Sequence, residues 1–218
     1  MTSPPAPPIM HSPLHAPRHV PPSPELDRPA IWLAPCPSSR LSEQRHAVDE
    51  LLQSAFAHPP FRAAVRPRLM HDPSGRPTLS EPYAALPISL AHTAGAVALA
   101  AGAPGQQVGV DVEAGHRRVN AARIAARTFS PGEIACFRAD AGTFWPIWTR
   151  KEALLKSLGL GLGDADWARY DTGDPAAEHN TVTLPQAPAS DVPAVEARVG
   201  HLWIDDLCVG WACWSRTA

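Results

Sequence analysis

The hexapeptide from Val108 to Glu113 places the strongest constraint on the fold. Its letters, VGVDVE, alternate apolar and acidic residues, which is the pattern of a β-strand. Because successive side chains of a strand point to opposite faces, Val110 and Val112 are expected to enter a core. Asp111 and Glu113 then project together from the other face. Two neighbouring carboxylates repel each other, so they are either solvated or hold a cation such as Mg²⁺, which prefers hard oxygen ligands.

Length and charge argue against some classes of protein. The chain has 218 residues, enough for one domain or two small halves, and its formal net charge of −2 gives no reason to expect a nucleic-acid or membrane partner. None of the four cysteines forms a C-x-x-C pair, so a zinc site or a redox motif is not expected. No apolar run could span a bilayer and no signal peptide is apparent. We therefore expect a soluble cytoplasmic protein.

The N-terminal segment differs in composition from the rest of the chain. Residues 1–29 hold 10 of the 26 prolines and few large apolar residues. Such a segment buries too little surface to offset the entropy of ordering, which predicts a disordered tail. The folded part is then expected over 30–218, as two halves, 30–105 and 106–218.

Hydrophobic spacing and turn residues predict the other elements. A helix over 43–57 follows Ser42 as N-cap, and Ser130 with Glu133 forms a capping box for another helix. Glu133 has this capping role whether or not it has another. The remaining predictions are a strand at 30–34, a hairpin at 86–101, helical character over 116–127, a helix over 145–159, and a hairpin at 201–214 that turns at Asp205 and Asp206.

The stretch from Trp148 to Lys156 is the second informative one. In a helix, Lys151 falls in the middle of an apolar stripe, where it either reaches to solvent or meets a buried anion. Glu152 and Lys156 lie one turn apart, and such a pair is worth only about 0.2–0.5 kcal/mol when exposed. The pair therefore does not explain the position of Lys151.

Several isolated residues have either a solvated position or a contact with an anion. Arg45 lies near a helix start, Arg76 lies in a stiff Gly-Arg-Pro loop, and His92 stands beside Thr93 before a glycine turn. A group of arginines forms either a solvated face or a basic surface for an acidic protein partner: Arg117, Arg118, Arg123 and Arg127.

Taken together, these stretches resemble the larger, Sfp-like type of 4′-phosphopantetheinyl transferase. The specific part is the acidic strand followed by Trp-x-x-Lys-Glu-Ala-x-x-Lys, which begins here at Trp148. The likeness covers roughly residues 73–163, with weaker flanks to about 30–215. The matching segments occur in the family's order: Gly75-Arg76-Pro77, Pro87 to Thr93, Val108 to Glu113, Phe129 to Glu133, Trp148 to Lys156, and Gly159-Leu160-Gly161.

The resemblance implies an α+β fold of two similar halves about a pseudo-twofold axis, with coenzyme A bound between them. It implies transfer of phosphopantetheine to a serine of an apo acyl or peptidyl carrier protein, with release of adenosine 3′,5′-bisphosphate. The chain is then expected to be a monomer. The pathway stays open between fatty acid, polyketide and nonribosomal peptide synthesis.

The resemblance also implies roles for individual residues. Mg²⁺ would be held against the pyrophosphate by Asp111, Glu113 and Glu152. Lys151 and Lys156 would contact phosphates, and either Glu152 or Glu133 would take the serine proton. The nucleotide end would be served by Arg45, Arg76, His92 and Thr93.

The chain departs from the family pattern in a few places. Ser89 and Ala91 stand where the family often has Asn and Ser, and a basic segment is missing between Leu33 and Arg45. Two other functions are considered: a non-catalytic carrier-protein binder and a Mg²⁺-dependent phosphohydrolase. Because all three acidic positions and both lysines are present, the transferase is favoured over the non-catalytic binder.

Overall fold

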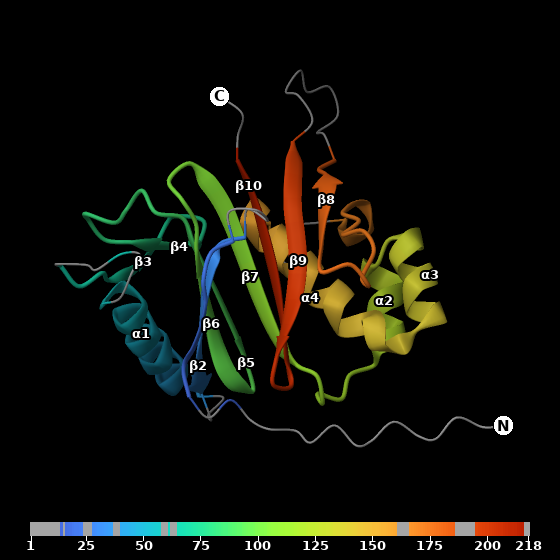
Figure 1. Ribbon diagram of the computed structural model, residues 1–218, viewed down its shortest axis with the longest axis horizontal. Coiled ribbons are helices and arrows are strands. Elements are labelled where there is room, and N and C mark those ends of the chain that lie inside the picture. Colours follow the sequence, from blue (N-terminus) through green and yellow to red (C-terminus); the bar gives the residue numbers. More distant parts are fainter. Residues whose placement is uncertain are drawn as a thin grey trace.

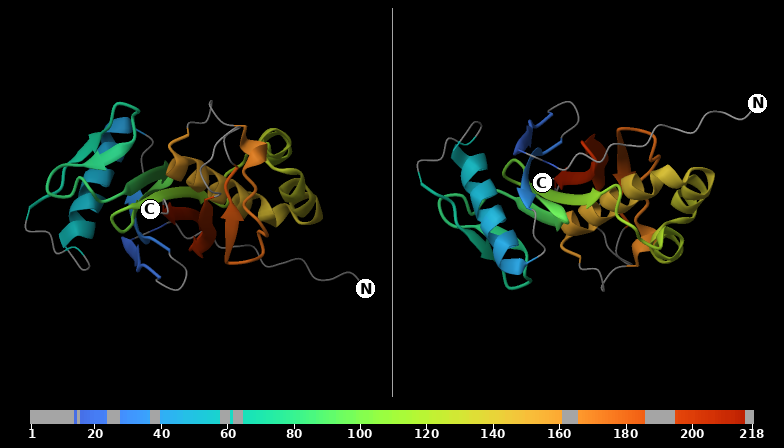
Figure 2. Two further views of the ribbon diagram at one scale, coloured as in Figure 1. Left: turned by 90° about the horizontal axis from the view of Figure 1, so that it is seen from above. Right: turned by 90° about the horizontal axis from the view of Figure 1, so that it is seen from below.

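The computed structural model describes residues 14, 16–23, 28–36, 40–57, 61, 65–160, 166–185 and 195–215. Helices and antiparallel sheets are both present, which confirms the predicted α+β class (Figure 1). In the views from above and below, α1 and the β3–β4 hairpin lie at one end of the molecule and α2 and α3 at the other (Figure 2). The two large sheets lie between these ends.

The first half contains a four-stranded sheet in the order β1-β2-β6-β5. Its strand β2 alternates between two cores, with Ile31 and Leu33 on one face and Trp32 on the other, where α1 packs. A separate hairpin, β3–β4, carries the loop with Arg76 at its turn. The bounds are β1 Arg18–Val20, β2 Ala30–Cys36, α1 Leu41–Ala57, β3 Leu69–His71, β4 Pro77–Leu79, β5 Ile88–Thr93 and β6 Gly95–Ala101.

The second half contains the sheet β7-β10-β9-β8 and the helices α2, α3 and α4. The capping box of Ser130 and Glu133 begins α3, and Gly159 in a left-handed conformation ends α4, as predicted. The bounds are β7 Gln106–Ala114, α2 Ala121–Thr128, α3 Pro131–Ala139, α4 Phe144–Leu158, β8 His179–Thr183, β9 Glu196–Ile204 and β10 Leu207–Ser215.

The two halves repeat one topology. Each contains a strand, β2 or β7, a helix that packs on it, α1 or α4, and a later hairpin whose second strand pairs with that strand. The resulting orders are β2-β6-β5 and β7-β10-β9. The expected likeness of the halves is therefore visible in their connectivity, whereas the pseudo-twofold axis stays a prediction.

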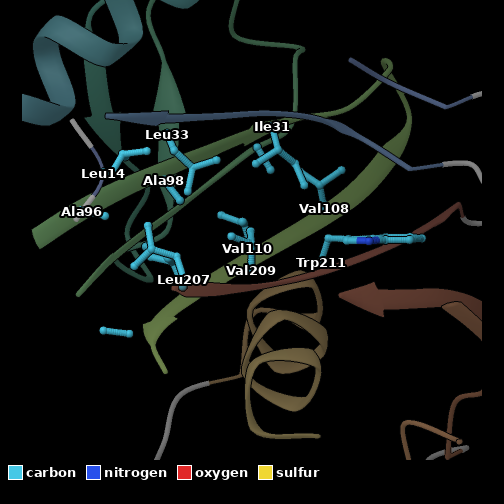
Figure 3. Packing of buried hydrophobic residues seen from close by; sticks show 14 of the residues in the cluster. Leu14, Ile31, Leu33, Ala96, Ala98, Val108, Val110, Leu207, Val209 and Trp211 are labelled. Atoms are coloured by element: carbon cyan, nitrogen blue, oxygen red, sulfur yellow. The ribbon is translucent and has the colours of Figure 1, made fainter. Parts of the chain in front are cut away.

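A shared core joins the halves. The inner face of the first sheet supplies Ile31, Leu33 and Ala98, and the facing sheet supplies Val110 and Val209 (Figure 3). Val110 is 0% exposed, as its place in the alternation predicted. Across this contact the hydroxyl of Ser89 on β5 accepts a hydrogen bond of 3.1 Å from the Val110 N–H on β7.

The ordered chain begins earlier than the predicted boundary at residue 30. Strand β1 pairs with β2, from Arg18 opposite Leu33 to Val20 opposite Ile31. Leu14 is only 5% exposed and belongs to the shared core (Figure 3). The high proline content concealed these few apolar residues, which add one short edge strand. Residues 1–13, 15 and 24–27 of the predicted tail lie outside the described residues.

No helix in the described part of the chain is both long enough and apolar enough to cross a membrane.

Candidate active site

Two glycines bring α4 directly against the second sheet. A Cβ at Gly109 on β7 would lie 1.8 Å from the carbonyl oxygen of Ala153. A Cβ at Gly210 on β10 would lie 2.2 Å from the carbonyl carbon of Thr149. No side chain could fit at either position, so the backbone of α4 rests on β7 and β10. The acidic face of β7 therefore looks toward α4.

This packing brings three carboxylates together. Asp111 and Glu113 on β7 are 6% and 9% exposed, and Glu152 approaches them from α4. Burial and, after it, the charge of the neighbouring Asp111 carboxylate raise the pKa of Glu152 from 4.5 to about 7. Glu113 adds to this repulsion, while Lys156 opposes it. We call Asp111, Glu113, Glu152 and Lys156 the acid cluster.

Lys156 lies within this cluster, one helical turn after Glu152. Its ammonium donates to Oδ1 of Asp111 at 2.7 Å and to the carbonyl of Val110 at 3.1 Å. Its side chain is 31% exposed, so the ammonium is also accessible from outside. The structure thus places a cation between the acidic strand and solvent.

Glu113 is held by one residue from each half. The hydroxyl of Thr93, at the end of β5, donates to its Oε2 at 2.9 Å. The guanidinium of Arg117 donates to its Oε1 at 2.5 Å. Thr93 therefore contacts one of the predicted metal ligands, a contact that its position in a turn did not reveal.

Asp111 has an oxygen without a partner. Its Oδ2 is buried and makes no hydrogen bond to any described residue. A buried carboxylate oxygen without a donor is costly, and a divalent cation is a natural partner for it beside Glu152. The donor set of Asp111, Glu113 and Glu152 consists of hard oxygens and fits Mg²⁺.

The carboxylates are not yet arranged around such an ion. Within the described ranges, no three acidic, histidine or cysteine side chains are grouped closely enough to hold a metal. Lys156 and Arg117 occupy one oxygen each of Asp111 and Glu113. Binding of a metal by all three carboxylates therefore requires side-chain movement.

A cavity of about 280 Å³ opens beside the cluster at the junction of the halves. Arg76 and Ser89 line it from the first half, and Lys156 and Gly159 line it from the second. Arg76 donates from Nη2 to the carbonyls of Ser157 and Lys156, at 2.8 and 3.3 Å, at the end of α4. Arg76 is thus close to Lys156, as expected of two residues that serve one ligand, and it also caps α4.

The other residues predicted for the nucleotide end are exposed. His92 stands at the end of β5, one residue before Thr93. Arg45 lies on α1, which covers the face of β2 and β6 that looks away from β7. The described contacts do not join either residue to the acid cluster, so their contact with coenzyme A stays a prediction.

Lys151 and Glu133 lie elsewhere, and their predicted roles need correction. Their side chains are 0% exposed and form an ion pair of 2.7 Å, which we call the buried pair. The ammonium of Lys151 also donates to the carbonyls of Trp167 and Tyr170. Burial lowers the pKa of Lys151, and the Glu133 carboxylate opposes that shift. The buried anion that Lys151 needed is therefore Glu133 and not a pyrophosphate.

Glu133 is fully engaged in this pair and its surroundings. Its Oε2 accepts from the Ser130 N–H at 2.8 Å as well as from Lys151. Its Oε1 accepts from the Thr172 N–H and hydroxyl at 2.9 and 2.7 Å. With both oxygens occupied and the side chain inaccessible, Glu133 is in no position to take a proton from a protein substrate.

Sequence reasoning missed two arginines. Arg117 had been grouped with other basic residues, and its spacing of four from Glu113 was no signal because Glu113 lies on a strand and not in a helix. Arg150 is 0% exposed and donates to the Asp174 carbonyl at 2.8 Å and to Nδ1 of His201 at 2.7 Å. Burial, and then the Arg150 charge, lower the pKa of His201 to about 4, so this histidine is a neutral acceptor. No local pattern indicated that contact.

Comparison with known proteins gives partial matches. A family model described as the 4′-phosphopantetheinyl transferase superfamily matches residues 107–210, from the acidic strand to β10. The 4′-phosphopantetheinyl transferase AcpT of Salmonella typhimurium is 36% identical over 98 residues, which are 43% of this chain and 50% of that protein. AcpT of Escherichia coli (strain K12) is 35% identical over 98 residues, 43% of this chain and 49% of that protein.

The chain spans about half the length of the curated relatives it matches. The family match nevertheless contains the acidic strand, the helix α4 that faces it, and all four residues of the acid cluster. The acidic strand and α4 carry the specific part of the sequence resemblance. The likeness of this chain to the 4′-phosphopantetheinyl transferase superfamily therefore covers residues 107–210.

Proposed function

We propose that the chain transfers the 4′-phosphopantetheine group of coenzyme A to a serine hydroxyl of an apo acyl or peptidyl carrier protein. The reaction needs Mg²⁺ and releases adenosine 3′,5′-bisphosphate. The observation that carries the proposal is the acid cluster itself. Three carboxylates and a lysine meet beside a cavity at the junction of the halves, and Oδ2 of Asp111 is buried without a donor.

Phosphoryl transfer requires mainly positioning and neutralisation of charge. Asp111, Glu113 and Glu152 would hold Mg²⁺, which when bound supplies positive charge against the pyrophosphate. Lys156 adds an ammonium that is already at 2.7 Å from Asp111 and partly exposed, so it can contact a phosphate at the mouth of the site. Arg76 lines the adjoining cavity, where part of the nucleotide would lie.

Glu152 is our candidate for the group that takes the serine proton. Its pKa of about 7 means that near neutral pH it is present both as carboxylate and as acid. Glu133 is set aside because both of its oxygens accept hydrogen bonds inside the buried pair. A carboxylate with a raised pKa is suited to proton transfer, since it binds a proton at the pH at which it works.

The experiment is to incubate the full chain with coenzyme A, Mg²⁺ and an apo carrier protein, and then to weigh the carrier by mass spectrometry. We expect the carrier to gain one phosphopantetheine group, and the gain to be lost with a chelator or with Asp111→Asn. Asp205→Asn is a matched control, since Asp205 is an exposed turn residue.

Other outcomes identify the other functions. A non-catalytic binder would associate with the carrier without changing its mass. A phosphohydrolase would cleave coenzyme A in the absence of any carrier. If several apo carrier proteins keep their mass while coenzyme A stays intact, the proposed transfer is overturned.

A further inference from the structure

The second cation of the site is Arg117, which pairs with Glu113, whereas Lys156 pairs with Asp111. Its guanidinium donates to Oε1 of Glu113 at 2.5 Å, and its side chain is 52% exposed. The backbone of this segment is fixed, because the Arg117 N–H donates to the Ala114 carbonyl and the Gly115 N–H to the Asp206 carbonyl. The exposed side chain of Arg117 can therefore change position while these backbone hydrogen bonds stay in place.

The two oxygens of Glu113 differ in the groups that hold them. Oε2 accepts from Thr93, which is 7% exposed and fixed at the end of β5. Oε1 faces the exposed side chain of Arg117. Of the two oxygens, Oε1 is therefore the one that can exchange its partner for an incoming ion.

A divalent cation and a guanidinium cannot occupy the same carboxylate oxygen comfortably, since two positive charges a few ångströms apart repel each other. With Arg117 in place, Glu113 does not join Asp111 and Glu152 in a group of three ligands within the described residues. Removal of the guanidinium from Oε1 is therefore a condition for a three-carboxylate site.

We propose that Arg117 is a competing counter-ion that lowers the affinity of the acid cluster for a divalent cation and leaves Glu113 when that cation binds. This inference rests on the proposed function, because it concerns the same site. Arg117 does not act on the reacting atoms here. Its role is to position and neutralise Glu113 while no metal is bound.

The test is a titration with Mn²⁺ in the absence of coenzyme A and carrier. The electron paramagnetic resonance signal of the free ion measures how much Mn²⁺ is bound. We compare the wild type with Arg117→Gln and with Arg118→Gln, which removes the same charge from the adjacent exposed residue. We expect Arg117→Gln to bind Mn²⁺ about three- to tenfold more tightly, since a partly exposed pair must no longer be broken. Arg118→Gln should stay within about twofold, because it removes only screened charge.

Arg117→Lys provides a second variant. It keeps the charge but loses the planar fork, so its Mn²⁺ affinity should lie between those of the wild type and Arg117→Gln. If the wild type binds Mn²⁺ and Arg117→Gln binds no more tightly than Arg118→Gln, the inference is overturned while the metal site stands. If no variant binds Mn²⁺, the inference and the metal site of the proposed function both fail.

Discussion

Lys151 and Glu152 are neighbours on α4, but they belong to two charge clusters with opposite properties. Lys151 enters the buried pair with Glu133, in which both side chains are 0% exposed and the carboxylate oxygens have donors. Glu152 enters the acid cluster, where Asp111 has a buried oxygen without a donor and the pKa of Glu152 rises to about 7.

This difference is the one expected between a structural charge pair and a site that binds a ligand. The buried pair is satisfied by the protein alone, so a ligand could only disturb it. The acid cluster is left incompletely neutralised, so an added cation would stabilise it. A complete set of partners marks the first site, and the missing partner marks the second.

The largest expected effect on stability comes from removing one partner of the buried pair. Lys151→Met should cost roughly 3–5 kcal/mol of unfolding free energy, because Glu133 would stay buried without its cation. Denaturant unfolding measures the loss. The double variant Glu133→Gln/Lys151→Met should recover part of it. Unchanged stability of the single variant would show that the pair contributes nothing.

Asp111→Asn should reduce transfer without reducing stability, in contrast to Lys151→Met. Transfer should fall by roughly 100-fold or more, the scale seen when one preorganised group is lost from a site. Stability without divalent cation should be unchanged or higher, because the substitution removes a charge that repels Glu152. Mass spectrometry of the carrier and thermal unfolding provide the two readouts. Activity close to that of the wild type would contradict the assignment of Asp111.

The pH dependence of stability should reveal the incomplete neutralisation. The pKa of Glu152 is raised from 4.5 to about 7, so the folded chain holds its proton more tightly than the unfolded chain does. The stability that this protonated carboxyl provides is fully present below pH 4.5 and is lost as the pH rises through 7. With a chelator present, the loss should approach roughly 3 kcal/mol. Glu152→Gln should remove this slope, and thermal unfolding between pH 5 and 8 would measure it.

His201 acts in the other direction and sets the control for that measurement. Its pKa is lowered from 6.5 to about 4, so the stability due to its neutral form is lost as the pH falls from 6.5 through 4. The Glu152→Gln variant and the wild type share this pH-dependent contribution of His201. An identical slope in the two proteins between pH 5 and 8 would therefore refute the assignment to Glu152.

The smallest expected effect concerns Arg76, which both caps the end of α4 and lines the cavity beside the acid cluster. Arg76→Ala should cost about 1 kcal/mol of unfolding free energy, because the carbonyls of Lys156 and Ser157 lose a donor in a partly exposed position. Calorimetric titration with coenzyme A distinguishes its roles. We expect weaker binding as well, whereas unchanged affinity would confine Arg76 to capping α4.

Local patterns predicted the elements that carry the site. The alternation from Val108 to Glu113 is a property of neighbouring residues, and it correctly assigned Val110 to the core. The capping box of Ser130 and Glu133 also depends on a few adjacent residues, and the structure confirms it. The resemblance assigned Lys156 to a phosphate, which stays a prediction, and the structure shows that Lys156 contacts Asp111.

The partners of the same residues could not be predicted in this way. The sequence showed that Lys151 needed an anion, but Glu133 and Thr172 come from segments whose approach depends on tertiary packing. The contact of Thr93 with Glu113 depends on how β5 lies against β7, two strands of different sheets. Strand β1 is only three residues long, too short to show a period.

Three contacts between the halves end on the parts of the second half that carry the site: Ser89 at Val110, Thr93 at Glu113 and Arg76 at the end of α4. A fragment that began at β7 would contain every carboxylate of the acid cluster, yet its inner sheet face would be bare and Glu113 would lose Thr93. We expect such a fragment to aggregate, because the apolar surface that the first half covers would face solvent. In genetic terms we therefore expect the two halves to be kept together in one reading frame, although the family likeness lies in the second.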